Sequence, residues 1–188
     1  MVNNYTKNYI DKFSLLLKDK KNLSKKIELT TKALKKTYKK NKIIIFGNGG
    51  SSSIASHFTI DIIKNTKLEC INFNDPAIIT CFSNDYGYEN WIKEALRFYA
   101  EKDDLLIIFS CSGKSKNLLN AARYAKKNQI NLVTFTGINI NNPLKKLNSS
   151  GLNIFVNSKS YNQIEIIHHL FILLTIDLCI GKKNYPVS

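Results

Sequence analysis

Short apolar runs alternate with longer segments of helical periodicity along most of the chain. Five runs are the expected strands, the second being the weakest, and they cover residues 42–46, 68–73, 104–110, 131–137 and 152–157. Helices are expected between and after them, at about 51–65, up to about 100, over 117–128, near 142–148 and over 162–180. Strands that are apolar on both faces and alternate with helices are typical of a parallel sheet covered on two sides. The pattern therefore predicts an α/β protein.

The first forty residues carry a helical pattern of their own. Apolar residues recur at helical spacing over 10–17 and again over 23–38, with a break near Lys20. The chain has three prolines and no Gly/Ser-rich linker. We therefore predict a single domain over residues 1–188, with 1–40 as an N-terminal helical arm.

The location of the protein is predicted from its apolar stretches and its cysteines. The apolar helix over 162–180 falls short of the ~20 residues that a membrane span needs, and the N-terminal stretch is too short and interrupted for a signal peptide. Four cysteines are scattered without CxxC spacing, which argues against a zinc ribbon or a disulfide framework. We expect a cytoplasmic protein without membrane contact, in which 162–180 is a buried core or interface helix.

The charge balance is strongly basic, with 28 Lys and Arg against 14 Asp and Glu and a formal net charge of +14. Such a charge raises the question of nucleic-acid binding. The lysines, however, are spread over predicted helix surfaces, and no DNA- or RNA-binding motif accompanies them. We therefore expect no nucleic-acid partner.

Two glycine- and serine-rich loops follow predicted strands and precede predicted helices. They read "GNGGSSS" (47–53) and "SCSGKS" (110–115). Glycines allow close backbone approach, and the free N–H groups of a helix N-terminus favour an anion. The first loop lacks GxGxxG spacing and no GK[ST] closes it, so it is neither a Rossmann fingerprint nor a P-loop, and alone it could be an ordinary tight turn. Because ligands bind beyond the carboxyl ends of parallel strands, the two loops together predict a site for a polyol phosphate, with Lys114 at its rim.

Four motifs, in this order and spacing, resemble the sugar isomerase (SIS) domain family: "GNGGSSSIASHF", "SNDYGYE", "SCSGKSKNLLNAARYAKKNQINLVTFTG" and "YNQIEIIHH". The resemblance covers about residues 5–180 and is closest to the phosphoheptose isomerase branch. It implies a flavodoxin-like three-layer αβα sandwich with a five-stranded parallel sheet and additional N-terminal helices. It also implies a homotetramer with active sites at subunit interfaces, in which the 1–40 arm packs on the domain and on neighbouring subunits.

The resemblance and the two loops together give a set of expected ligand-binding residues. Those expected to bind the phosphate or the sugar are Asn48, Gly49, Gly50, Ser51, Asn84, Asp85, Ser110, Cys111, Ser112, Ser115 and Asn162.

The chemistry of an aldose–ketose isomerase needs a base and an acid, or a metal that polarises the carbonyl while a proton moves. His57 and Asp61 are spaced i, i+4, which places them on one helix face just beyond the first loop. They are either a base with its partner, or two metal ligands, or simply a hydrogen-bonded pair on a helix. The family has His and Glu at these positions, so Asp61 is one methylene shorter.

The last predicted helix supplies the remaining candidates, Glu165, His168 and His169. The family motif has a Gln three residues before a His and a second His five residues further on. If His168 is aligned with the first His, Glu165 stands at the Gln and Leu173 at the second His. His169 lies one turn before Leu173 and would offer an imidazole in its place. The alternative is that the two histidines only pack at an interface.

These candidates lead to two sets of roles. Asp61 is the expected base, with His168 or His169 as the acid. The expected metal ligands, for Zn²⁺ or another divalent ion, are His57, Asp61, Glu165 and one of the two histidines, His168 in the aligned arrangement.

The predicted function is therefore a phosphosugar isomerase. The resemblance implies interconversion of sedoheptulose 7-phosphate and a heptose 7-phosphate through an enediol, for the heptose of surface polysaccharides such as lipopolysaccharide or capsule. Asp61, Glu165 and Leu173 differ from the residues of the family motif. These differences leave two alternative functions open. One is a non-catalytic SIS protein that binds a phosphosugar and regulates, and the other is an isomerase of altered sugar specificity.

Overall fold

The structure is a computed structural model, and it describes residues 3–181. Its elements follow the chain in the order α1 (Asn4–Leu16), α2 (Lys20–Lys36), β1 (Ile43–Gly47), α3 (Gly50–Asn65), β2 (Cys70–Ile71), α4 (Pro76–Tyr86), α5 (Trp91–Tyr99), β3 (Leu105–Ser110), α6 (Lys116–Lys127), β4 (Asn131–Thr136), α7 (Pro143–Leu147), β5 (Leu152–Phe155) and α8 (Tyr161–Ile180).

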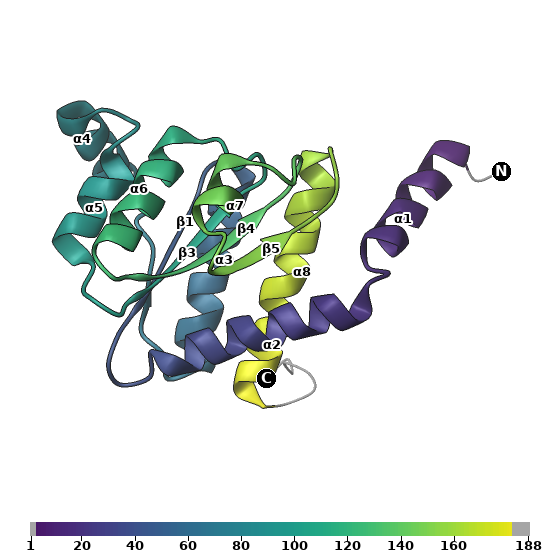
Figure 1. The fold of residues 1–188 in the computed structure, drawn as a ribbon, viewed down its shortest axis with the longest axis horizontal. Helices are drawn as coiled ribbons and strands as arrows, with labels where there is room; N and C mark the ends of the chain where they lie inside the picture. The colour runs from purple at the N-terminus through teal and green to yellow at the C-terminus, as the bar shows by residue number, and fades with distance from the viewer. Residues whose placement is uncertain (1–2, 182–188) are drawn as a thin grey trace.

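The described strands form one parallel sheet in the order β2-β1-β3-β4-β5, covered by helices on both faces (Figure 1). Successive residues of β1 point to opposite faces: Ile43 and Ile45 pack with α2, α3 and α8, whereas Ile44 and Phe46 pack with α5, α6 and α7. This confirms the predicted three-layer αβα sandwich with a five-stranded parallel sheet.

The N-terminal helices are also confirmed. Leu34 of α2 is fully buried on the face of the sheet that α8 shares. Helix α1 points away from the layers (Figure 1), and its C-terminal end packs Phe13 and Leu16 against the same core. The division into a single domain over 1–188, and any contact of the arm with other subunits, stay predictions.

The segment 74–100 differs from its prediction, because two helices stand where the sequence suggests one. Asp75 accepts hydrogen bonds from the first backbone N–H groups of α4, and Pro76 takes the first helical position. Helix α4 ends at Gly87, whose φ of 80° favours glycine. The chain therefore turns before α5 begins.

Helix α8 is long and apolar enough to cross a membrane by length and composition alone. However, 44% of its most apolar window is buried in the described protein, where it packs against α2 and α3. Residues such as Ile164, Ile167 and Phe171 belong to the core. This placement agrees with the prediction of a core helix.

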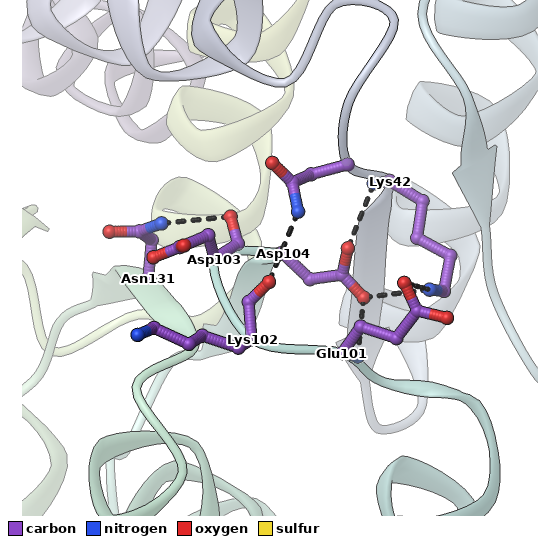
Figure 2. Close-up of polar contacts among 7 residues, drawn as sticks. Lys42, Glu101, Lys102, Asp103, Asp104 and Asn131 are labelled. Atoms are coloured by element: carbon purple, nitrogen blue, oxygen red, sulfur yellow. Dashed lines mark hydrogen bonds and ion pairs between the residues drawn. The ribbon is translucent and has the colours of Figure 1, made fainter.

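At the amino ends of the strands, the carboxylate of Asp104 is fully buried and holds together the starts of β1 and β3 (Figure 2). Its Oδ1 accepts from the backbone N–H of Lys42 at 2.9 Å, and its Oδ2 accepts from the backbone N–H of Glu101 and from Lys42 Nζ, both at 2.8 Å. At the same edge, Asn131 donates to the carbonyl of Asp103. The carboxylate of Asp104 and the backbone groups around it at this edge of the sheet are thus hydrogen-bonded within the protein.

The carboxyl ends of β1 and β3 lead directly into the two predicted loops and the N-termini of α3 and α6. The first turn is tight, because a Cβ at Gly47 would lie 2.4 Å from the Ser51 carbonyl oxygen. Gly49 follows with a φ of 55°, which L-residues rarely adopt. These two glycines set the start of α3 against the end of the sheet.

Candidate active site

A cavity of about 130 Å³ lies between the two predicted phosphate loops and the start of α8. Hydroxyl, amide, thiol and carboxylate groups line it, together with two apolar residues and a tyrosine. The lining residues are Asn48, Ser51, Phe109, Ser110, Cys111, Ser112, Ser115, Leu118, Tyr161 and Glu165. The structure thus brings the predicted phosphate-binding residues of both loops together.

A second cavity is much larger, about 1180 Å³, and lies between α1, α2 and the connection from β5 to α8. None of the predicted site residues lines it. We take the smaller cavity as the candidate site, because the predicted phosphate-binding side chains line it and none of them lines the larger cavity.

The two loops are fixed to each other by a pair of amides. Asn48 Nδ2 donates to Asn117 Oδ1 at 3.1 Å, and Asn117 Nδ2 donates to Asn48 Oδ1 at 3.0 Å. Tyr88 Oη also donates to Asn48 Oδ1, at 3.5 Å. Sequence reasoning missed Asn117 and Tyr88. Both residues lie in quoted motifs, Tyr88 in "SNDYGYE" and Asn117 in the motif that begins "SCSGKSKN", but no spacing singles either out as a partner of Asn48.

Glu165 of α8 reaches into the cavity. Its carboxylate lies over Gly50, the first residue of α3, and a Cβ there would be 2.5 Å from Glu165 Oε2. Cys111 Sγ donates to Glu165 Oε1 at 3.9 Å. Burial raises the pKa of the Cys111 thiol to about 11, so the thiol stays protonated at neutral pH.

Next to this cavity along α3 and α8, two predicted catalytic residues, Asp61 and His169, form a chain of contacts with the predicted metal ligand His57. His57 Nε2 lies 3.3 Å from Asp61 Oδ2, and His57 Nδ1 lies 2.7 Å from His169 Nε2. The two imidazole rings are perpendicular, with centroids 4.8 Å apart. His57 is exposed to solvent, whereas Asp61 is buried, with an exposed fraction of only 8%. The order is carboxylate, imidazole, imidazole.

The contacts assign the protons of this chain. Because the Asp61 carboxylate only accepts, Nε2 of His57 carries a proton, and Nδ1 then accepts from His169 Nε2–H. Nδ1 of His169 keeps its lone pair and has no hydrogen-bond partner among residues 3–181. Burial lowers the pKa of His169, His57 lowers it further and Asp61 acts in the opposite direction. A neutral His169 is therefore a proton acceptor near pH 7.

His168 does not join these residues. Its ring is fully buried beside Phe109 and Phe135, and its Nε2 donates to the carbonyl oxygen of Thr136 at 3.3 Å. Burial lowers the pKa of His168 to about 4. The expectation of His168 as an acid or a metal ligand is therefore wrong on position, because neighbouring helix residues point about 100° apart and His168 takes the side that faces the sheet.

Three predicted sugar-binding residues also lie outside the cavity. Asn84 and Asp85 are exposed on α4, where Asn84 Nδ2 donates to Asp85 Oδ1 at 3.0 Å. Asn162 is exposed in the first turn of α8. None of the three lines the 130 Å³ cavity.

The predicted metal ligands do not fit a zinc site in this arrangement. His57 uses both ring nitrogens in the contacts above, Glu165 points to Cys111 and Gly50, and His168 lies in the core. Across residues 3–181, no three His, Cys, Asp or Glu side chains are grouped as metal ligands. Zinc stays a prediction from the sequence, and no reaction step is assigned to it.

Comparison with known proteins agrees with this geometry. The family model described as SIS domain matches residues 8–137. The phosphoheptose isomerase of Helicobacter pylori (strain ATCC 700392 / 26695) is 34% identical over 180 residues, which covers 88% of this chain and 92% of that relative. That of Cytophaga hutchinsonii is 35% identical over 125 residues, slightly under two thirds of each chain (64%). The solved phosphoheptose isomerase of Francisella tularensis superposes with a TM-score of 0.87 at 25% identity, covering 97% of this chain and all of that one.

Since the family model matches more than half of its length, the chain belongs to the SIS domain family. The relatives that match most of the chain in sequence and in structure include phosphoheptose isomerases.

Proposed function

We propose that the protein is an aldose–ketose isomerase that interconverts sedoheptulose 7-phosphate and a heptose 7-phosphate. The observation that carries the proposal is the adjacency of two features. A cavity lined by serine hydroxyls lies at the N-terminus of α3, and the Asp61–His57–His169 chain lies next to it on the same helices. The match to phosphoheptose isomerases over most of the chain supports the choice of substrate.

The spacing along α8 suits a linear phosphosugar. Glu165 lines the phosphate cavity, and His169 follows four residues later on the same helix face, about 6 Å further along the axis. In an open-chain heptose 7-phosphate, the phosphate and the reacting C1–C2 end are separated by a chain of carbon–carbon bonds of about 1.5 Å each. A phosphate held between the loops therefore directs the reacting carbons toward His169.

The phosphate is held by groups that need not move. Ser51, Ser110 and Ser115 line the cavity, and the N-terminus of α3 adds the positive end of its dipole. Lys114, within the second loop, is exposed. The combination binds an anion and leaves the polyol chain free to extend along α8.

Proton transfer is assigned to His169. Its free Nδ1 takes a proton from C1 of the ketose, the electron pair forms the C1–C2 double bond, and the proton of the O1 hydroxyl passes to O2. Return of a proton to C2 then gives the aldose. The imidazolium that forms on His169 is stabilised through His57 by the Asp61 carboxylate, in the manner of a catalytic triad. Asp61, the base expected from the sequence, becomes a positioning residue because it is buried behind His57.

The proposal is tested by NMR of sedoheptulose 7-phosphate incubated with the protein in D₂O, with and without added zinc. Turnover with deuterium at C2 of the product is the expected result. Binding without turnover under both conditions would contradict it and favour a non-catalytic phosphosugar-binding protein. Elemental analysis of the dialysed protein tests the zinc prediction separately.

We further propose that the chain forms a homotetramer in the cytoplasm and supplies heptose for surface polysaccharides. Large apolar residues are exposed on the outer faces of α3 and α8, among them Ile60, Ile63, Ile166 and Leu178, and they support a covered interface. Light scattering in solution tests the assembly, with a mass about four times 21.4 kDa as the expected result.

A further inference from the structure

The anion that the structure shows at the start of α3 is a side chain of the protein itself. Both carboxylate oxygens of Glu165 lie within 2.7 Å of the position that a Cβ on Gly50 would take. Glu165 also lines the 130 Å³ cavity between the two loops. The carboxylate therefore lies between the two serine-containing loops, in the cavity where an incoming phosphate would bind.

No other charge in this part of the molecule competes with Glu165 for that place. The first turn of α3 contains no acidic residue, and its N-cap residue, Gly49, offers no side-chain hydrogen bond. The residues that line the cavity include no Lys or Arg. A dianionic phosphate that enters with Glu165 in place meets a negative charge without a lining cation to balance it.

Glu165 is held weakly. Among the described residues its polar contact is the long Cys111 Sγ–Oε1 hydrogen bond of 3.9 Å. The residue is partly exposed and lies on the second turn of α8, next to the path that the polyol chain would follow. Rotation of the side chain would move the carboxylate off Gly50 and toward the hydroxyls of a bound sugar.

We propose that Glu165 is a specificity-determining residue that occupies the phosphate position in the free protein. Small inorganic anions must displace it without compensation, whereas a phosphosugar gives the displaced carboxylate new hydroxyl donors. The site therefore discriminates against free phosphate in favour of polyol phosphates. This inference rests on the proposed function for the identity of the sugar, but not for the competition between Glu165 and phosphate.

The test is isothermal titration of inorganic phosphate and of sedoheptulose 7-phosphate into the wild-type protein, Glu165→Gln and Glu165→Ala. Removal of the negative charge is expected to increase the affinity for inorganic phosphate by about tenfold in both variants. The affinity for the phosphosugar should rise by less, because the carboxylate–hydroxyl contacts are lost at the same time. Glu28→Gln, an exposed change on α2, is the matched control and should alter neither affinity.

Equal affinity of wild type and both Glu165 variants for inorganic phosphate would overturn the inference. A phosphosugar affinity that rises as much as that for phosphate would overturn its specificity part. If sedoheptulose 7-phosphate binds to none of the proteins, the proposed function fails, while the titrations with inorganic phosphate still decide the role of Glu165.

Discussion

The two ends of the sheet use their polar residues in opposite ways. At the amino end, the buried Asp104 carboxylate is satisfied by two backbone N–H groups and the Lys42 ammonium (Figure 2). At the carboxyl end, the hydroxyls of Ser110 and Ser115 have no hydrogen-bond partner in the described chain, and a carboxylate, Glu165, has only a distant thiol.

The difference shows which end is built for stability and which for a ligand. Polar groups without a partner in the protein are available to bind a ligand, whereas the Asp104 carboxylate already has its hydrogen bonds within the protein. Changes at the amino end should therefore lower stability with little effect on catalysis. Changes at the carboxyl end should do the reverse.

The largest effect is expected from His169→Asn, which removes the nitrogen that we assign as the base. The value of kcat/KM should fall by about 10³-fold, within the range for loss of a general base. The thermal midpoint should stay close to that of the wild type, because His169 is only partly buried. A coupled assay of heptose phosphate formation and a thermal melt measure the two quantities.

Two variants make this prediction sharper. Asp177→Asn, near the other end of α8, is the matched control and should retain full activity. Asp61→Asn should lower kcat less than His169→Asn does. The reverse order would return the role of base to Asp61.

The next effect is on stability, at the amino end. Asp104→Asn places an amide N–H against the Lys42 ammonium or the Glu101 N–H, and leaves the Lys42 ammonium with only the exposed Glu101 carboxylate, 3.9 Å away. The free energy of unfolding should fall by about 3 kcal/mol in urea titrations. The exposed neighbour is the control, since Asp103→Asn changes the same charge at a position with a φ of 69°, which Asn tolerates. If the folded Asp104→Asn variant lost activity, the amino end of the sheet would serve catalysis as well as stability, and the contrast between the two ends would be contradicted.

The pH dependence of stability should report His168. Its pKa is about 4 in the folded protein, against 6.5 for the ordinary side chain. Between these values the unfolded chain binds the proton and the folded one does not, so stability is complete above pH 6.5 and is lost as the pH falls toward 4. The expected loss from pH 7 to pH 5 is about 2 kcal/mol. Unfolding titrations at the two pH values should show a smaller loss for His168→Leu, and an unchanged loss would refute the assignment.

The smallest effect is expected from Ser115→Ala. The Ser115 hydroxyl makes no capping hydrogen bond to α6, so its removal should leave stability nearly unchanged. Loss of one hydrogen bond to a charged phosphate should raise KM by about tenfold. Ser149→Ala, in the connection between α7 and β5, is the control for the change of residue type. A loss of stability without any change in KM would mean that the hydroxyl serves the fold.

The sequence predicted the sheet, its helices and the two loops because each depends on local pattern. Apolar runs flanked by glycines and serines mark strand ends, and parallel strands bring those ends together. The break between α4 and α5 was missed, because it depends on one glycine, Gly87, within a continuous mixed segment.

The site was predicted only in part, because packing decides what adjacent residues face. His168 and His169 are equivalent in the sequence, and only the position of α8 against the sheet places one in the core and the other beside His57. The contact between Asn48 and Asn117 joins residues that are 69 positions apart, and no local spacing reveals it.

The most direct test of the comparison is to map where the phosphosugar binds. In ¹⁵N–¹H correlation spectra, added sedoheptulose 7-phosphate should shift the backbone amides of 49–53 and 110–115, and leave those of Lys42 and Asp104 in place. Shifts that instead gather around the 1180 Å³ cavity between α1, α2 and α8, or at the amino end of the sheet, would contradict the account.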